Sequence, residues 1–86
     1  MRVFAYERFR KAYQELPHTI QQKVDKQLAL LASNPRYPSL QVKRIQGARG
    51  VWEARVDLHY RMTFEVKGDV IYLRVVGHHD EALKHP

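Results

Sequence analysis

Two stretches near the start of the chain have the hydrophobic spacing of amphipathic helices. From Glu7 to Leu16, apolar side chains recur three and four positions apart, so they lie on one helical stripe. Pro17 ends this helix, because a proline disfavours helical geometry in the residue before it. A second stripe follows the expected N-cap Thr19 and stops at Asn34-Pro35. Two short helices with a tight join predict a helical hairpin, preceded by a short strand at residues 2–5.

The second half of the chain changes to the alternation that is typical of β-strands. Apolar and polar residues alternate over residues 52–57, 60–66 and 71–76, and a further short strand is expected at residues 42–45. Such alternation predicts antiparallel strands with one buried face and one open face. The expected fold class is therefore α+β, an N-terminal helical hairpin packed on a small antiparallel β-sheet, in one domain over residues 1–86.

A two-residue turn at Gly68-Asp69 predicts the register of the last hairpin. This turn makes Lys67 face Val70, and a slip by one residue would mix apolar with polar side chains. The expected partners are Val66–Ile71, Phe64–Leu73 and Met62–Val75 on the buried face, and Thr63–Arg74, Arg61–Val76 and His59–His78 on the open face.

The preceding connection, around residues 57–59, is also short, and the same reasoning places Arg55 opposite Arg61. Two arginines directly opposite each other on a sheet repel. An anion bound between them explains the pair better than folding does, and the alternative is a solvated face partly neutralised by carboxylates. The side chains expected to share this patch are Glu53, Arg55, Arg61, Arg74 and His78.

The composition agrees with an anionic partner. The 86 residues carry 15 Lys and Arg against 9 Asp and Glu, a net charge of +6, which indicates phosphate-rich or acidic protein partners. The absence of cysteine excludes disulfides and thiolate metal sites. No apolar run reaches the roughly 20 residues of a membrane span, and no signal-peptide pattern is present, so a cytoplasmic protein with no membrane contact is expected.

The end of the last strand brings candidates for acid–base chemistry, because imidazole changes charge near neutral pH. His78 and His79 lie beside the predicted arginines, and Glu53 is either a base or a salt-bridge partner. A metal ion is the rival for His78-His79-Asp80. Adjacent residues of a strand point to opposite faces, and the chain has no HExxH spacing. No metal or other cofactor is therefore expected.

Several segments, taken together with their order and spacing, are similar to those of one known family over nearly the whole chain. They are Phe9…Tyr13…Leu16-Pro17, Leu31-Ala32-Ser33-Asn34-Pro35, Lys43-Arg44-Ile45-Gln46-Gly47, Gly50-Val51-Trp52-Glu53-Ala54-Arg55-Val56, Tyr60-Arg61 and Val76-Gly77-His78-His79-Asp80. The sequence thereby resembles the RelE/ParE toxin superfamily. The resemblance implies a type II toxin that is held inactive by an acidic antitoxin. Members of the RelE branch are metal-independent ribonucleases that cut mRNA in the ribosomal A site, where attack by the 2′-hydroxyl yields a cyclic phosphate.

Three functional positions of the family match this chain. A basic residue of the RelE branch matches Arg55, the arginine of the family's Tyr-Arg pair matches Arg61, and the histidine of YoeB-like members matches His79, or His78 if the alignment slips. The chain departs from RelE itself at Glu53, where RelE has a basic residue. It also lacks the arginine and tyrosine that RelE carries after its last strand, which leaves the branch and the catalytic competence open.

The resulting hypothesis is a nuclease site in which Arg55 and Arg61 clamp the scissile phosphate. One of His78 and His79 acts as general acid, and Glu53 or the other histidine acts as base. Tyr72 is a candidate for stacking on a base, whereas Trp52 falls on the buried face. Further RNA contacts are expected from Lys43, Arg44, Arg49 and Arg74. The alternatives are a ParE-like poison of DNA gyrase and a non-catalytic relic that binds RNA or its antitoxin.

Overall fold

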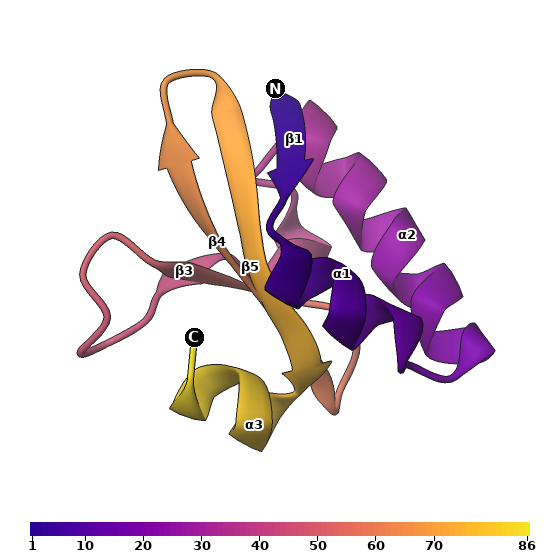
Figure 1. Cartoon of the computed structure of the whole chain (residues 1–86). Helices are drawn as coiled ribbons and strands as arrows, with labels where there is room; N and C mark the ends of the chain where they lie inside the picture. Colours follow the sequence, from indigo (N-terminus) through magenta and orange to yellow (C-terminus); the bar gives the residue numbers. More distant parts are fainter.

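The apolar faces of the helical hairpin and of the sheet pack against each other, so the expected α+β class is confirmed (Figure 1). The computed structural model describes residues 1–86. The elements along the chain are β1 (Arg2–Ala5), α1 (Glu7–Gln14), α2 (His18–Ser33), a 3₁₀ helix η1 (Pro38–Leu40), β2 (Lys43–Arg44), β3 (Trp52–Arg55), β4 (Tyr60–Lys67), β5 (Val70–His78) and α3 (His79–Lys84). None of the helices is long and apolar enough to cross a membrane.

The sheet has the strand order β1-β5-β4-β3-β2 and is mixed. The four strands from β2 to β5 pair antiparallel, as expected, but β1 pairs in parallel with β5 from Arg2–Val70 to Ala5–Leu73. The expectation of a purely antiparallel sheet was therefore wrong at one edge. A parallel pair needs a long connection, and here nearly the whole chain lies between the two strands, which local alternation cannot reveal.

Pro17 separates the two helices and also starts the second one. Helix α1 ends at Gln14, and α2 begins at His18, with Pro17 in an extended conformation as its N-cap. The carbonyl oxygen of Pro17 accepts hydrogen bonds from the backbone N–H groups of Ile20 and Gln21, at 2.9 and 3.0 Å. Thr19 lies inside the helix, so the prediction that it is the N-cap was wrong. A proline needs no hydrogen-bond partner for its own nitrogen, which suits the start of a helix.

The register of the last hairpin follows the sequence prediction near the turn and then slips by one residue. Lys67 faces Val70, Val66 faces Ile71 and Phe64 faces Leu73, as expected. A β-bulge between Thr63 and Phe64 then makes Thr63 face Val75, Met62 face Val76 and Tyr60 face His78. Val76 is thereby buried beside Met62 in the core. A bulge adds one residue to one strand only, so strict alternation misplaced these partners.

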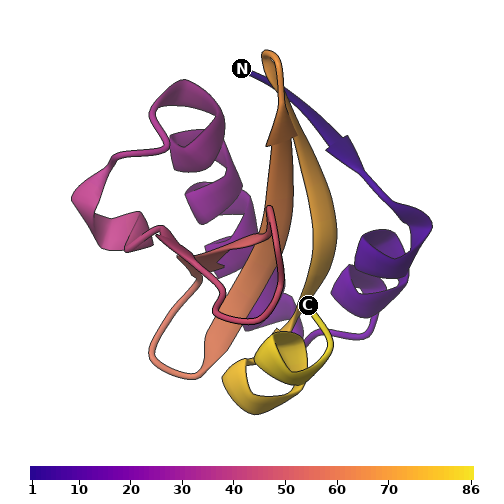
Figure 2. The same ribbon diagram turned by 90° about the vertical axis from the view of Figure 1, so that its left-hand side faces the viewer.

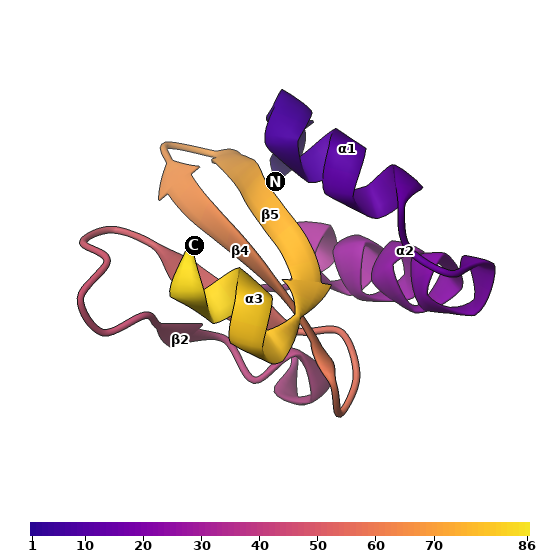
Figure 3. The ribbon, with the colours of Figure 1, turned by 60° about the horizontal axis from the view of Figure 1, so that its bottom comes forward.

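Helix α3 was not predicted, and it changes the accessibility of the sheet. It leaves the end of β5 and runs back in front of β4 and β5 (Figures 2 and 3). Thr63 Oγ1 and Arg74 Nε both donate to the carbonyl oxygen of Pro86, at 3.0 and 2.9 Å. Thr63 beneath this segment is 0% exposed, and Glu53 on the same face is 6% exposed. The face that the sequence predicted to be open is thus partly covered.

One buried polar side chain fastens α2 to the sheet. Gln27 lies among the core residues, and its Nε2 donates to the backbone oxygen of Arg55 at 2.8 Å and of Ser39 at 3.3 Å. It therefore ties α2 to the end of β3 and to η1. Because buried carbonyl groups need a donor, Gln27 helps to hold the strand that carries Arg55.

We expect Gln27→Ala to lower the free energy of unfolding by about 2 kcal/mol, because it leaves a buried carbonyl group unsatisfied and removes side-chain volume. The matched control is Gln22→Ala, the same substitution on the exposed face of α2, which should change stability by less than about 0.5 kcal/mol. Urea unfolding followed by circular dichroism measures both values. Equal effects of the two substitutions would contradict the anchoring role.

Candidate active site

The arginine pair predicted from the sequence is present in the sheet. Arg55 and Arg61 are Cα partners across β3 and β4, and Glu53 and Thr63 are the next pair on the same face. Residues directly opposite each other in an antiparallel pair project to the same side. The two guanidinium groups therefore start from neighbouring positions on one face of the sheet.

Arg61 is held in place by the loop that joins the two strands. Its Nη1 donates to the backbone oxygens of Asp57 at 2.6 Å and Tyr60 at 2.9 Å, and its Nε lies 3.8 Å from Glu53 Oε1. The side chain is only 19% exposed. Its Nη2 makes no hydrogen bond within the protein. Arginine has five N–H donors, so this fixed side chain retains donors for an anion.

Glu53 lies beneath two cations. Its carboxylate is 3.8 Å from Arg61 Nε and 4.0 Å from Lys43 Nζ, and it is nearly buried. Arg55, in contrast, is partly exposed, and its side chain makes no ion pair or hydrogen bond within the protein. The two arginines thus differ. Arg61 is a positioned group with a carboxylate partner, whereas Arg55 is a free guanidinium group.

The Asp57 carboxylate organises the loop between β3 and β4. Asp57 Oδ1 accepts hydrogen bonds from the backbone N–H groups of His59 and Tyr60, both at 2.9 Å, and Oδ2 lies 3.0 Å from Lys23 Nζ on α2. Burial raises the pKa of Asp57, but the bonds from His59, Lys23 and Tyr60 outweigh it and hold the pKa below the usual value. The loop therefore depends on an ionised carboxylate.

Three histidines and one carboxylate meet where β5 turns into α3. The backbone N–H of His79 donates to the backbone oxygen of His59 at 2.7 Å. The ring centroids of His59 and His78 are 6.0 Å apart, those of His78 and His79 are 4.8 Å apart, and His79 Nδ1 lies 2.8 Å from Asp80 Oδ1. The strand ends at His78. The argument that adjacent strand residues must diverge was therefore wrong for His78 and His79, because the second belongs to a helix.

The predicted five-residue patch is only partly assembled. Glu53, Arg55 and Arg61 lie together, but Arg74 is bonded to Glu65 at 2.8 Å and to Pro86. His78 faces Tyr60, whereas Arg61 faces Gly77. Successive residues alternate across a sheet, so His78 projects to the opposite side from Arg61. The bulge in β5 is the physical reason for this change.

The four predicted RNA contacts lie in different settings. Lys43 lies beside Glu53 on the arginine face, and Arg44 lies over the ring of Trp52, at 5.1 Å from its centroid. Arg49 is in the loop between β2 and β3, which lines a shallow hollow. Arg74 is fully engaged, as described above. Lys43 therefore has the most direct access to an anion held by the arginine pair.

Tyr72 is part of an aromatic cluster on the other half of the arginine face. Its ring is stacked on Tyr6 at 5.9 Å and meets Phe4 edge-on at 5.7 Å. Lys67 Nζ lies 5.4 Å from the Tyr72 ring centroid. These contacts fix β1 to β5, so Tyr72 has a structural role that its position in the sequence did not reveal. Trp52 packs against the core, as predicted.

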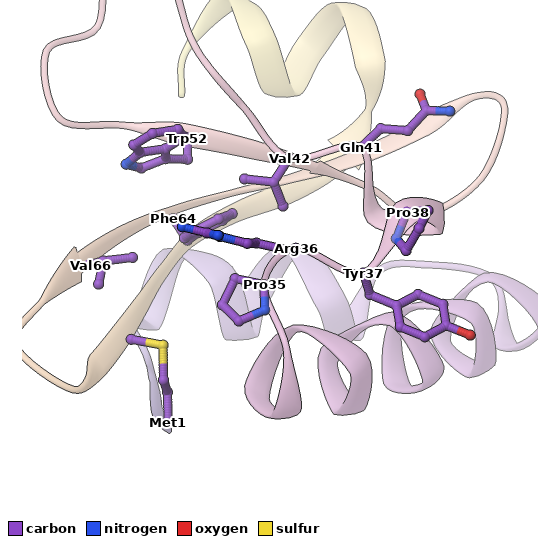
Figure 4. A pocket seen from close by; sticks show the side chains of 10 residues that line it. All are labelled: Met1, Pro35, Arg36, Tyr37, Pro38, Gln41, Val42, Trp52, Phe64 and Val66. Carbon is purple, nitrogen blue, oxygen red and sulfur yellow. The ribbon is translucent and has the colours of Figure 1, made fainter.

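An apolar groove of about 640 Å³ lies away from these charged groups, between the end of α2, η1 and the strands β3 and β4 (Figure 4). Trp52, Phe64 and Val66 form one wall, and the segment after α2 forms the other with Pro35 and Tyr37. The groove contains no carboxylate or imidazole. It is suited to bind apolar side chains and lacks groups for acid–base chemistry.

Three residues at the site have roles that the sequence alone did not assign. Asp57 closes the loop, His59 supplies the backbone oxygen that binds His79, and Asp80 orients the His79 ring. A signal existed for Asp57, because an aspartate often accepts a hydrogen bond from the amide two residues later and so forms an Asx turn. The position of His59 depends on the meeting of distant segments, which no local pattern contains.

Comparison with known proteins relates this arrangement to toxins. The profile of the ParE-like toxin domain matches residues 18–80. Among solved structures, the chain is similar to YafQ from E. coli, with 15% identity, 94% and 97% of the two chains covered and a TM-score of 0.79. It is similar to RelE in the RelB–RelE antitoxin–toxin complex of Methanococcus jannaschii, with 25% identity, 96% and 99% covered and a TM-score of 0.74. No curated protein sequence matches the chain.

We expect Asp57→Asn to lower stability at neutral pH by about 1–2 kcal/mol, because the carboxylate accepts charge-assisted hydrogen bonds. Since the folded-state pKa is lowered, this stabilisation is present above the unfolded pKa near 3.9 and is lost as the pH falls through the folded pKa. The difference between wild type and variant should therefore shrink below about pH 4. Unfolding curves across this pH range measure it. Asp69→Asn, at an exposed turn, should show no comparable pH-dependent loss.

Proposed function

Because the chain belongs to the ParE-like toxin family, we propose that it is the toxin of a type II toxin–antitoxin system and cleaves mRNA on the ribosome without a metal. The RelE branch that the sequence resembles carries this activity, and the fold is shared with RelE and YafQ. Ribosome-bound mRNA as substrate places its action in the cytoplasm. The observation that carries the proposal is the opposed pair of Arg55 and Arg61, with Arg61 immobilised and Arg55 free.

The arginine pair is the phosphate clamp of this mechanism. Arg61 presents its remaining N–H donors from a fixed position, and Arg55 closes on the phosphate from the neighbouring strand. Fixed cations stabilise the charge that develops on the non-bridging oxygens in the transition state. Glu53 positions Arg61, because its buried carboxylate lies against Arg61 Nε. Lys43, on the same face, contacts a neighbouring phosphate group.

The loop between β3 and β4 connects the clamp to the histidines. Arg61 is bonded to the backbone oxygen of Asp57, and His79 is bonded to that of His59. These oxygens are two residues apart, so they lie within about 7 Å of each other. One short loop thus anchors both the Arg61 side chain and the backbone of His79.

His79 is the general acid in this proposal. Its Nδ1 is oriented by Asp80 at 2.8 Å, so Nε2 points away from the carboxylate and is available to protonate the 5′-oxygen. Glu53, the carboxylate beside Arg61 on the arginine face, takes the 2′-hydroxyl proton, because His78 projects to the other side of the sheet. The 2′-oxygen forms a bond to phosphorus while the bond to the 5′-oxygen breaks, which yields a 2′,3′-cyclic phosphate and a 5′-hydroxyl. Acid–base groups of this kind contribute roughly 10²–10⁴-fold each.

We expect Arg61→Ala and His79→Ala each to slow mRNA cleavage by about 100-fold or more, because each removes charge stabilisation or proton transfer. The assay is single-turnover cleavage of mRNA on programmed ribosomes, together with growth arrest on induction. Arg2→Ala is the control, since Arg2 lies on the edge strand and is 77% exposed, and it should retain full activity. If both site variants are folded and fully active, this assignment of the site is wrong.

The same induction experiment distinguishes the ParE-like alternative. A gyrase poison would damage DNA and leave mRNA intact, and that outcome would replace the nuclease proposal. If induction leaves growth unaffected and the chain still binds its antitoxin, the chain is instead a non-catalytic relic. Mapping of RNA ends and of DNA breaks in the same cells separates the three functions.

The antitoxin is expected to bind the apolar groove. The groove is lined by apolar side chains (Figure 4), and Val66 on its rim is 42% exposed. The net charge of +6 favours an acidic partner. RelE and YafQ have been crystallised with the antitoxins RelB and DinJ. An acidic segment with apolar anchors would fit this combination of groove and charge.

We expect Val66→Glu to weaken binding of the antitoxin encoded beside this chain by about tenfold or more, because it places a charge in an apolar contact. Leu58→Glu is the matched control, because Leu58 is 64% exposed and does not line the groove. Titration calorimetry with the purified antitoxin measures both affinities. Equal affinities for wild type and Val66→Glu would place the antitoxin elsewhere on the toxin.

A further inference from the structure

The histidine cluster at the end of β5 has the chemistry of a metal site. We propose that His78 and His79, oriented by Asp80, bind one divalent transition-metal ion of the zinc, nickel and copper class. One ligand atom from each of the three residues lies within 4.8 Å of the other two. All three side chains have solvent access, so an ion can reach them.

The spacing of the donor atoms suits a single ion. Two nitrogens that each lie about 2.1 Å from a metal are at most about 4.2 Å apart. The ligand atoms of His78, His79 and Asp80 lie within 4.8 Å of one another, which is close to this limit. His78 is exposed at a strand end, and its ring neighbours are the rings of His59, Tyr60 and His79.

The turn of the chain at His78 makes this convergence possible. His78 has an extended backbone, with φ −57° and ψ 142°, and α3 begins at the next residue. The change of direction brings the two rings to 4.8 Å instead of sending them to opposite faces. The bond from the His79 N–H to the His59 oxygen, at 2.7 Å, fixes this corner.

Asp80 gives the site an outer-shell partner. Its Oδ1 lies 2.8 Å from His79 Nδ1, so Nδ1 carries the proton and Nε2 offers its lone pair to the ion. Metal-binding histidines commonly donate their second N–H to a carboxylate in this way. His59 adds a third imidazole, 6.0 Å from His78, which can complete the coordination or shield the bound ion.

The donor set selects the class of metal. Imidazole nitrogens suit zinc, nickel and copper, whereas magnesium and calcium require several oxygen ligands. Only one carboxylate is present in the cluster, so the site discriminates against magnesium. The expected order of affinity places copper(II) above nickel(II) and above zinc(II).

Occupancy of the site would inhibit the toxin, an inference that rests on the proposed function. A metal bound to His79 Nε2 takes the lone pair that must carry the transferred proton. The acid of the proposed reaction is then lost, although the arginine clamp remains intact. A transition metal would therefore be a reversible inhibitor of an otherwise metal-independent enzyme.

The direct test is calorimetric titration of tag-free protein with zinc, nickel, copper and magnesium chlorides. We expect one zinc, nickel or copper ion per chain, no saturable magnesium binding, and a loss of about tenfold or more in affinity in His78→Ala, His79→Gln and Asp80→Asn. His18→Ala, a histidine at the start of α2 outside the cluster, should bind like wild type. Lack of saturable binding, or affinity that survives His78→Ala with His79→Gln, would overturn the site.

A second measurement separates this site from the proposed nuclease. Electron paramagnetic resonance of the copper-loaded protein should show hyperfine coupling to two imidazole nitrogens, which is lost in His79→Gln. This readout and the titration need no RNA, so they decide the site even if the chain does not cleave mRNA. If the chain cleaves mRNA, zinc should slow the reaction and a chelator should restore it. Cleavage that is unaffected at saturating zinc would refute the inhibition and leave the nuclease assignment standing.

Discussion

The short loop between β3 and β4 is the constraint on which the functional face depends. One ionised carboxylate, that of Asp57, accepts two backbone N–H bonds and an ion pair from α2. The loop in turn offers its carbonyl oxygens to Arg61 and to His79. The Arg61 side chain on β4 and the backbone of His79 at the start of α3 are therefore held to one loop. Rigid support of this kind is what a phosphate-transfer site requires, because catalysis loses most when charged groups must reorganise.

Much of the fold could be predicted from local pattern. Alternation located the three long strands, and helical spacing located α1 and α2, because each needs only the identity of nearby residues. The pairing of Arg55 with Arg61 was also correct, since a short connection and apolar matching leave one register. Features that depend on distant contacts were missed or misplaced. The parallel edge strand β1, the bulge in β5 and the return of α3 all belong to this group.

The candidate site shows the same division. Residue type and strand alternation predicted that Glu53, Arg55, Arg61 and His79 lie close together. They could not show that Glu53 is nearly buried, because this depends on how the neighbouring side chains, Arg61 and Lys43 among them, pack around it. They also placed His78 on the arginine face, which the bulge reverses. A one-residue irregularity thus decides which side chains share a surface.

The buried Glu53 has a consequence for the RNA binding that we propose for this face. RelE, which the sequence resembles, carries a basic residue at this position, so the substitution changes the local charge by two units. A phosphate would then compete with Glu53 for Arg61, unless the two anions use different donors. Arg61 Nη1 donates to two backbone carbonyl oxygens, and Nε faces Glu53. Nη2 therefore remains for the phosphate. Arg55, which has no partner, must supply the rest of the attraction. In the proposed function, this arrangement favours one bound phosphate over general attraction to nucleic acid, because an arginine paired with a carboxylate directs hydrogen bonds but adds little long-range field.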